Sequence, residues 1–187
     1  MSNQLAVLFP GIGYHIDKPL LYYSAKRARA RGCDLLSVQY PALPTGLRGH
    51  AEKIEQAVQT ALSAAEEQLT AIDWTAYDRV FFLSKSIGTA IAARYAVQHN
   101  IHPRQVYYTP IEQALPYLDP TGIAFHGTAD PWARTELITE GCRRLGVPLH
   151  LTENADHSME TGDVLQDITI LHTILEQTDR WMRQRCI

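Results

Sequence analysis

The sequence predicts an α/β fold, a three-layer sandwich whose mostly parallel sheet has about six strands and whose single domain spans residues 1–187. Short apolar runs alternate with longer segments of helical periodicity from end to end, and no linker or repeat divides the chain. The composition, 45% hydrophobic and 20% charged, is that of a globular protein. A chain of 187 residues can bury a core without disulfides or a structural metal.

The chain opens with a strand, a helix and a second strand. Residues 5–9 form a continuous apolar run, which suits a strand buried on both faces, as in a parallel sheet. Residues 19–31 predict a helix, because Pro19 fits a first turn and Gly32 fits the position after the last turn. Residues 34–39 predict the second strand.

The middle of the chain repeats this alternation. Apolar residues recur at helical spacing over residues 51–69 and predict an amphipathic helix. Residues 79–83, with the sequence RVFFL, form the clearest strand, and a helical pattern over residues 87–99 follows directly.

The last part supplies three further strands and two helices. Residues 105–109 and 122–126 predict strands with a short irregular or helical stretch between them. Residues 131–145 predict a helix, residues 147–151 a last strand, and residues 164–182 a C-terminal amphipathic helix.

Active sites on such sheets lie at the carboxyl ends of the strands, so the residues directly after each strand are the candidates for chemistry. Ser86 follows the clearest strand at a predicted strand-to-helix turn. A nucleophilic serine in such a turn needs small residues two positions before and after it, and Ser84 and Gly88 meet this need. The alternative is a plain strand–helix turn.

A serine hydroxyl is a poor nucleophile unless a base takes its proton. His157 directly follows the last predicted strand, and Asp130 directly follows the strand before it. The chain order Ser86, Asp130, His157 therefore predicts a nucleophile, an orienting carboxylate and a base. The alternatives are a helix N-cap role for Asp130 and an ordinary loop position for His157.

Four motifs give the chain a resemblance to the α/β-hydrolase superfamily, particularly its small, lid-less dienelactone-hydrolase-like and esterase-like members. The motifs are FPG at residues 9–11, SKSIG at residues 84–88, HGTAD at residues 126–130 and DH at residues 156–157. The resemblance spans nearly the whole chain and implies a minimal core that lacks the family's first strand pair. The link over residues 110–121 is too short for a lid domain, so we expect an open site.

The resemblance also implies the roles of backbone groups. The family's oxyanion hole uses the N–H after the nucleophile, here that of Ile87, and one N–H from the loop after the first strand. Ile12 is the expected second donor and Gly11 the alternative. The chain departs from the family's pattern in having Ser84 in place of a glycine and FPG in place of His-Gly.

Three residues near these motifs are candidates for binding substrate. His15 follows the expected oxyanion loop, although a surface position is an equal alternative. Lys85 is a candidate for steering an acidic substrate, against the default of a solvated lysine. Trp132 is a candidate for lining the acyl or leaving-group pocket, against a place in the core.

Two phosphate-binding motifs are excluded. Lys85-Ser86 resembles the end of a P-loop, but the glycines that this loop requires upstream are missing. Gly11-Ile-Gly13 lacks the third glycine of a dinucleotide-binding loop, and an oxyanion loop explains the two glycines as well.

Net charge and cysteine content limit the kinds of partner and the cellular compartment that we expect. A net charge of −3 gives no basic excess for nucleic acid or an anionic membrane, and no apolar run approaches the ~20 residues of a membrane helix. Cys33, Cys142 and Cys186 cannot all pair within one chain, and no CxxC spacing occurs, so we expect free thiols in the cytoplasm. His99 and His102 lack further ligands for a metal and are expected to be exposed.

These observations predict a serine hydrolase that cleaves a small-molecule carboxylic ester or thioester through an acyl-enzyme, with neither metal nor organic cofactor. Two alternatives stay open. One is a non-catalytic α/β-hydrolase scaffold that binds a partner or small ligand, and the other is an acyltransferase that uses the same three side chains. The sequence leaves the oligomeric state open.

Overall fold

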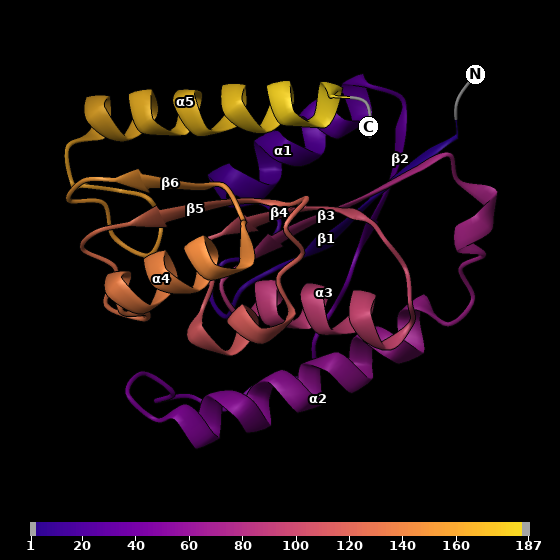
Figure 1. Cartoon of the computed structure of the whole chain (residues 1–187), viewed down its shortest axis with the longest axis horizontal. Helices are drawn as coiled ribbons and strands as arrows, with labels where there is room; N and C mark the ends of the chain where they lie inside the picture. The colour runs from indigo at the N-terminus through magenta and orange to yellow at the C-terminus, as the bar shows by residue number, and fades with distance from the viewer. Residues whose placement is uncertain (1–2, 185–187) are drawn as a thin grey trace.

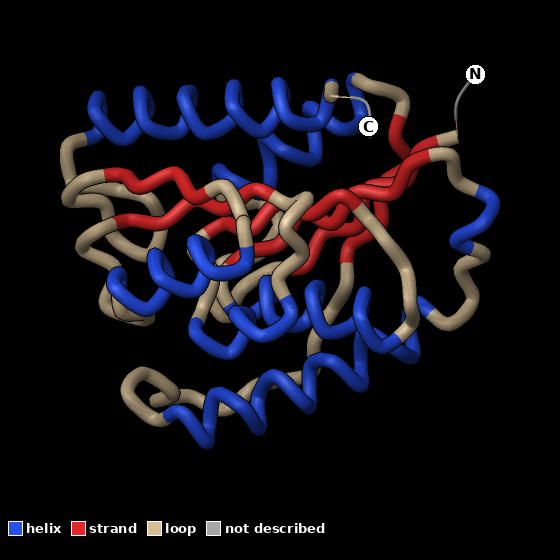
Figure 2. The backbone as a smooth tube through the Cα atoms, in the orientation of Figure 1, coloured by secondary structure: helices blue, strands red, loops and turns tan. Residues whose placement is uncertain are grey.

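The structure is a computed structural model that describes residues 3–184. Six strands form one sheet in the order β2-β1-β3-β4-β5-β6, and every neighbouring pair is parallel (Figures 1 and 2). The strands are β1 (Gln4–Phe9), β2 (Cys33–Ser37), β3 (Arg79–Lys85), β4 (Arg104–Tyr108), β5 (Ile123–Gly127) and β6 (Leu149–Thr152). The predicted fold class is confirmed, and the sheet is entirely parallel.

Helices cover both faces of the sheet, as an all-parallel sheet requires. The α-helices are α1 (Pro19–Ala30), α2 (Ala51–Leu69), α3 (Ile87–Gln98), α4 (Thr135–Leu145) and α5 (Val164–Arg183). Two short 3-10 helices are η1 (Trp74–Ala76) and η2 (Glu112–Tyr117). Figure 1 shows α1 and α5 above the sheet, and α3 and α4 below it with α2 as the outermost helix.

The central strand β3 contributes to the cores on both faces. Phe82 belongs to the core beneath α2 and α3, whereas Phe81 and Leu83 belong to the core beneath α1 and α5. This alternation is the period of two that a strand imposes on its side chains. The observed strand continues to Lys85, two residues beyond the predicted end, and Lys85 shares the face of Leu83.

The predicted helix over residues 131–145 begins too early, because α4 starts at Thr135. The Asp130 carboxylate accepts a hydrogen bond from the Trp132 N–H at 2.8 Å, and the chain bends over residues 131–133. The first helical hydrogen bond of α4 runs from the Ile138 N–H to the Arg134 carbonyl. Asp130 is therefore not the cap of this helix.

The connection between β4 and β5 contains only η2, which packs against α3 and α4. Cys33 and Cys142 are buried free thiols, and Cys186 lies outside the described residues. Between residues 3 and 184, no helix combines the length and the apolar character needed to cross a membrane.

Candidate active site

The residues that the sequence places after the strands come together at the carboxyl edge of the sheet. Ser86 joins β3 to α3, Asp130 follows β5, and His157 follows β6. The parallel strands end at the same edge, so side chains 71 and 27 residues apart along the chain meet there.

The backbone at Ser86 is strained in the way a tight strand-to-helix turn requires. Its φ of 55° and ψ of −124° lie in a region that non-glycine residues rarely adopt. The Ser86 N–H donates to the carbonyl of Tyr108 at 3.0 Å, which ties the turn to β4. The turn lifts the hydroxyl off the helix end, where it makes no capping hydrogen bond.

The small residues around Ser86 allow this turn. A methyl group at Gly88 would collide with the carbonyl oxygen of Phe9, because α3 approaches β1 closely at this point. Ser84 stands where the family has glycine, and its fully buried hydroxyl donates to the Val106 carbonyl at 2.8 Å. A satisfied serine hydroxyl is tolerated in the core, which explains how the chain accommodates this departure.

Three side chains form a hydrogen-bonded relay. His157 Nε2 lies 2.7 Å from Ser86 Oγ, and His157 Nδ1 lies 2.6 Å from Asp130 Oδ2. If Nδ1 carries the proton and donates it to the carboxylate, Nε2 is free to accept from the serine hydroxyl. This arrangement suits proton transfer from Ser86 to His157.

The Asp130 carboxylate is held in its ionised form. Burial alone would raise the pKa of Asp130, but the hydrogen bond from His157, assisted by that from the Trp132 N–H, brings the pKa below its usual value. The buried His126 Nδ1 lies 3.6 Å from Asp130 Oδ2. Burial lowers the pKa of His126, which favours its neutral form.

His157 is favoured in its neutral form as well. Burial lowers the pKa of His157 and the positive charge of Lys85 lowers it further, and together they outweigh the opposite effect of Asp130. The Trp132 ring stacks on the imidazole, with the ring centroids 5.7 Å apart and an interplanar angle of 30°. The indole therefore limits the positions open to the imidazole.

The glycine of the HGTAD motif brings the acid and the base together. A methyl group at Gly127 would collide with the carbonyl oxygen of Ala155, because the end of β5 packs directly against the loop that carries His157. The Ala129 N–H donates to the same carbonyl at 3.0 Å. This backbone contact fixes the two loops relative to each other.

Two backbone N–H groups, those of Ile12 and Ile87, belong to residues beside Ser86. Ile87 is the first residue of α3, where a helix leaves its N–H groups without partners of its own. Gly11 and Tyr14 exchange two backbone hydrogen bonds and close a tight turn, which leaves the Ile12 N–H outside the pairing. Ile12 and Ile87 both line the cavity that contains Ser86.

The structure rules out the N–H of Gly11 as the alternative donor. Its N–H donates to the Tyr14 carbonyl at 3.0 Å and is therefore not available to a ligand. Glycine is needed there for a different reason, because a methyl group at residue 11 would lie 3.0 Å from Ser86 Cβ.

The cavity around Ser86 and His157, named here the Ser86 cavity, has a volume of about 230 Å³. Apolar side chains dominate its walls, and the sequence reasoning missed four of the lining residues: Tyr14, Leu47, Ile54 and Ile111. Leu47 and Ile54 come from the segment after β2, and Ile111 follows β4. The rule that residues after parallel strands form the site would have pointed to these segments.

The three substrate-binding candidates have different outcomes. Trp132 lines the Ser86 cavity. His15 does not: its side chain is 63% exposed and lies 3.4 Å from the Asp17 carboxylate. Lys85 is neither solvated nor in the cavity, since it is fully buried beneath the site.

Lys85 is an unusual group to find in a core. Its ammonium nitrogen has no hydrogen-bond partner among the described residues and lies 4.8 Å from the centre of the Tyr14 ring. Burial lowers the pKa of Lys85 to about 7, while the negative charges of Asp130 and Asp156 oppose this shift. Lys85 therefore acts on the site through its charge and not through contact with a ligand.

Within residues 3–184, no group of three or more His, Cys, Asp or Glu side chains is arranged to hold a metal ion.

No protein-family model matches the sequence, and no curated protein matches it. Solved structures resemble the fold. A serine hydrolase without a lid from Xanthomonas campestris is 15% identical, with a TM-score of 0.64 over 100% of this chain and 85% of that chain. A serine hydrolase homologue from Coxiella burnetii is 15% identical, with a TM-score of 0.65 over 96% and 85% of the two chains. An esterase from Pyrococcus furiosus is 12% identical, with a TM-score of 0.64 over 97% of this chain and 84% of that chain.

Proposed function

We propose that this chain, which has the α/β-hydrolase fold of those structures, is a serine hydrolase that cleaves carboxylic esters or thioesters of small molecules. The observation that carries the proposal is the relay of 2.7 and 2.6 Å hydrogen bonds from Ser86 through His157 to Asp130. The strained turn at Ser86 supports it, because strain of this kind persists where function needs it. The esterase among the structural neighbours supports the class of bond that is cleaved.

The proposed reaction has two halves. Ser86 Oγ attacks the carbonyl carbon as its proton passes to His157 Nε2, and a tetrahedral intermediate forms. His157 then returns the proton to the leaving oxygen or sulfur as the bond to it breaks, which leaves an acyl-serine. Water, deprotonated by His157, attacks the acyl-serine and releases the acid, and the proton returns to Ser86. Asp130 stabilises the imidazolium that forms in each half.

The Ile12 and Ile87 N–H groups would bind the oxyanion of both intermediates. Such a donor typically contributes about 3–4 kcal/mol to transition-state stabilisation. The apolar walls of the Ser86 cavity favour an apolar acyl group of modest size.

A fluorophosphonate probe tests the proposal, because it phosphonylates only an activated serine. We expect stoichiometric labelling of the wild-type protein at Ser86, no labelling of Ser86→Ala and strongly slowed labelling of His157→Ala. Ser63→Ala, which removes an exposed hydroxyl on α2, is the matched control and should label at the wild-type rate.

A folded wild-type protein that does not react would contradict the proposal and favour the binding scaffold. Labelling of Ser86→Ala at the wild-type rate would also contradict it. For a labelled protein, product analysis with added alcohol separates hydrolysis from acyl transfer, since transfer yields a new ester instead of the free acid.

A further inference from the structure

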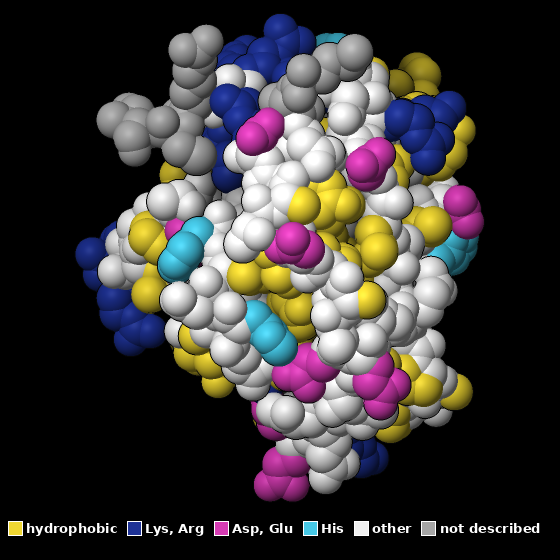
Figure 3. Space-filling view, turned by 90° about the vertical axis from the view of Figure 1, so that its right-hand side faces the viewer, with side chains coloured by type: hydrophobic (Ala, Val, Ile, Leu, Met, Phe, Trp, Pro, Cys, Tyr) yellow, Lys and Arg dark blue, Asp and Glu magenta, His cyan; other side chains and the backbone are white. Residues whose placement is uncertain are grey.

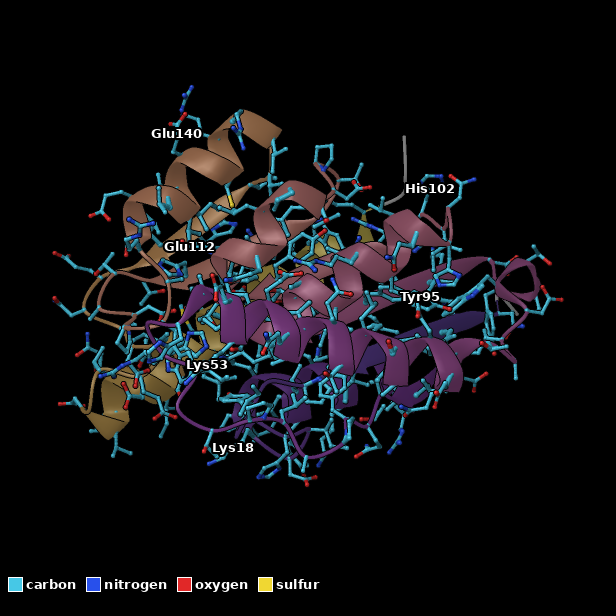
Figure 4. The ribbon with its side chains drawn as sticks, turned by 90° about the horizontal axis from the view of Figure 1, so that it is seen from below. Lys18, Lys53, Tyr95, His102, Glu112 and Glu140 are labelled. Atoms are coloured by element: carbon cyan, nitrogen blue, oxygen red, sulfur yellow. The ribbon has the colours of Figure 1, made fainter. Side chains whose placement is uncertain are left out.

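A second cavity of about 520 Å³, named here the Glu112 cavity, adjoins the Ser86 cavity. The two share Ile54, Pro131 and Trp132 in their walls. The start of α2, the start of η2 and the segment from β5 into α4 form the Glu112 cavity. Figure 4 shows Glu112 between α4 and the beginning of α2. Apart from Asp130 and Trp132, the residues that line this cavity have no role in the reaction described above.

Its position relative to His157 indicates which part of a substrate it receives. The leaving group must lie beside His157, because the imidazole returns a proton to it. The Trp132 ring stacks on the imidazole and borders both cavities. A leaving alcohol beside His157 can therefore extend past Trp132 into the Glu112 cavity, with the acyl group among the apolar walls around Ser86.

The lining of the Glu112 cavity is polar and offers both donors and acceptors. Glu112 and Glu136 supply carboxylates, and Arg134 supplies a guanidinium whose Nε lies 3.0 Å from Glu112 Oε1. The hydrogen bond from Arg134 holds the pKa of Glu112 below its usual range, so this carboxylate stays ionised. The first residues of α2 and α4 also line the cavity, and neither helix has a side-chain cap on its N–H groups.

The charges that a ligand in this cavity can reach are close to balanced. Asp130 also lines the cavity, but its carboxylate is fully buried and its two oxygens are bonded to His157 and to the Trp132 N–H. Among the other groups, two carboxylates face one guanidinium and two helix N-termini, each equivalent to about half a positive charge. A cation or an anion would find no excess of opposite charge, and an alkyl group would leave the polar walls unpaired. Hydroxyl groups satisfy both halves of the lining, because each donates to a carboxylate and accepts from an N–H.

We infer that the Glu112 cavity binds a polyhydroxylated, sugar-like alcohol, so that the substrate class is a short apolar acyl ester of such an alcohol. The indole of Trp132 supplies an apolar wall against which a sugar ring packs. This inference rests on the proposed function for its reaction, and on the cavity alone for its ligand.

Two esters with the same acyl group test the inference, 6-O-butyryl glucose and ethyl butyrate. We expect kcat/KM of the wild-type protein to be at least tenfold higher for the glucose ester. Glu136→Gln should lower the ratio of the two kcat/KM values at least threefold, because it removes a charged acceptor from the cavity. Glu140→Gln is the matched control, since Glu140 lies one turn further along α4 and points away from the cavity (Figure 4), and its ratio should equal that of wild type.

Binding to the Ser86→Ala protein separates this inference from the proposed function. Calorimetry should show tighter binding of the glucose ester than of ethyl butyrate even where no turnover occurs. Equal kcat/KM values for the two esters in an active wild-type protein would overturn the inference and leave the hydrolase intact. An unchanged ratio in Glu136→Gln would overturn it too. If the fluorophosphonate probe does not label the wild-type protein but Ser86→Ala binds the glucose ester more tightly than ethyl butyrate, the proposed hydrolase function is overturned and this inference stands.

Discussion

At the residue scale, the burial of Lys85 beside the Ser86 relay has the clearest electrostatic effect. Its positive charge disfavours a second positive charge on His157 and so lowers the pKa of the imidazole from the ordinary value of 6.5. The proposed reaction needs neutral His157, so kcat/KM should rise with pH through this lowered pKa. Lys85 itself is charged over that range, because its pKa of about 7 lies higher.

Lys85→Met should therefore move the acidic limb of the kcat/KM profile to higher pH. The substitution removes the charge that opposes protonation of His157, and the pKa of His157 rises. The profile is measured with p-nitrophenyl butyrate between pH 4 and 8. Lys26→Met, which removes an exposed lysine on α1, should leave the limb in place. An acidic limb that stays put or moves to lower pH in Lys85→Met would show that Lys85 does not tune the base.

The strain at Ser86 predicts a cost in stability. Glycine adopts a φ of 55° freely, whereas serine and alanine do not. Ser86→Gly and Ser86→Ala both lack the hydroxyl, so their difference isolates the backbone. We expect Ser86→Gly to have a free energy of unfolding about 1 kcal/mol higher than Ser86→Ala by urea denaturation, after the larger chain entropy of unfolded glycine is allowed for. Equal stabilities would mean that the turn carries no strain.

Sequence reasoning identified the three relay residues because each follows a strand. The strands of a parallel sheet end at the same edge, so residues that follow them come together. It missed the burial of Lys85 because the predicted strand ended at Leu83. Two more residues of strand place Lys85 on the same face as Leu83, inside the core. The backbone hydrogen bond of Gly11 is invisible in sequence, because only the closed turn reveals which N–H group is taken.

At the scale of elements, the contact between β1 and α3 sets the geometry of the site. Gly88→Ala places a methyl group against the Phe9 carbonyl, and backbone atoms cannot move aside as a flexible side chain can. We expect a loss of about 2–4 kcal/mol in the free energy of unfolding. A methyl group at Gly32 meets no atom within 4 Å. Gly32→Ala should therefore lower the free energy of unfolding only by the cost of about 1 kcal/mol that alanine has in a left-handed backbone conformation. Equal losses in the two variants would remove the steric argument.

Most element positions followed from periodicity and from the helix-ending glycines. The misplaced start of α4 has a tertiary cause. Asp130 followed by Pro131 is a good helix start in isolation, but the Asp130 carboxylate is shared between His157 and the Trp132 N–H. A side chain committed to a partner 27 residues away cannot be recognised by a local pattern.

At the scale of the molecule, one carboxylate fastens the C-terminal helix to α1. Asp179 of α5 is buried and accepts hydrogen bonds from Arg27, Arg31 and Arg183 at 3.2, 3.0 and 3.0 Å. Figure 3 shows Lys and Arg side chains gathered over this end of the molecule. Burial alone would raise the pKa of Asp179, but the hydrogen bonds from the arginines bring it to about 2.

Asp179→Asn should lower the free energy of unfolding at pH 7 by about 2 kcal/mol, less than for a fully buried pair because the arginines are partly exposed. The wild-type contribution is present above pH 3.8 and is lost as the pH falls toward 2, so the difference between the two proteins should shrink over that range. Glu176→Gln, which breaks an exposed pair with Arg180, should cost less than about 0.5 kcal/mol. A difference that is independent of pH would contradict this account.

The buried apolar side chains of α5 lie toward its C-terminus. Ile174, Trp181 and Met182 are buried, whereas Val164, Leu165 and Ile168 are 70%, 76% and 58% exposed. The first turns of the helix are held instead by polar contacts: Asp163 accepts hydrogen bonds from the Leu165 and Gln166 N–H groups, and Asp167 accepts from Thr161. Deuterium should consequently enter the amides of its opening turns by local fraying well before it enters those around Asp179, which wait for opening of the whole core.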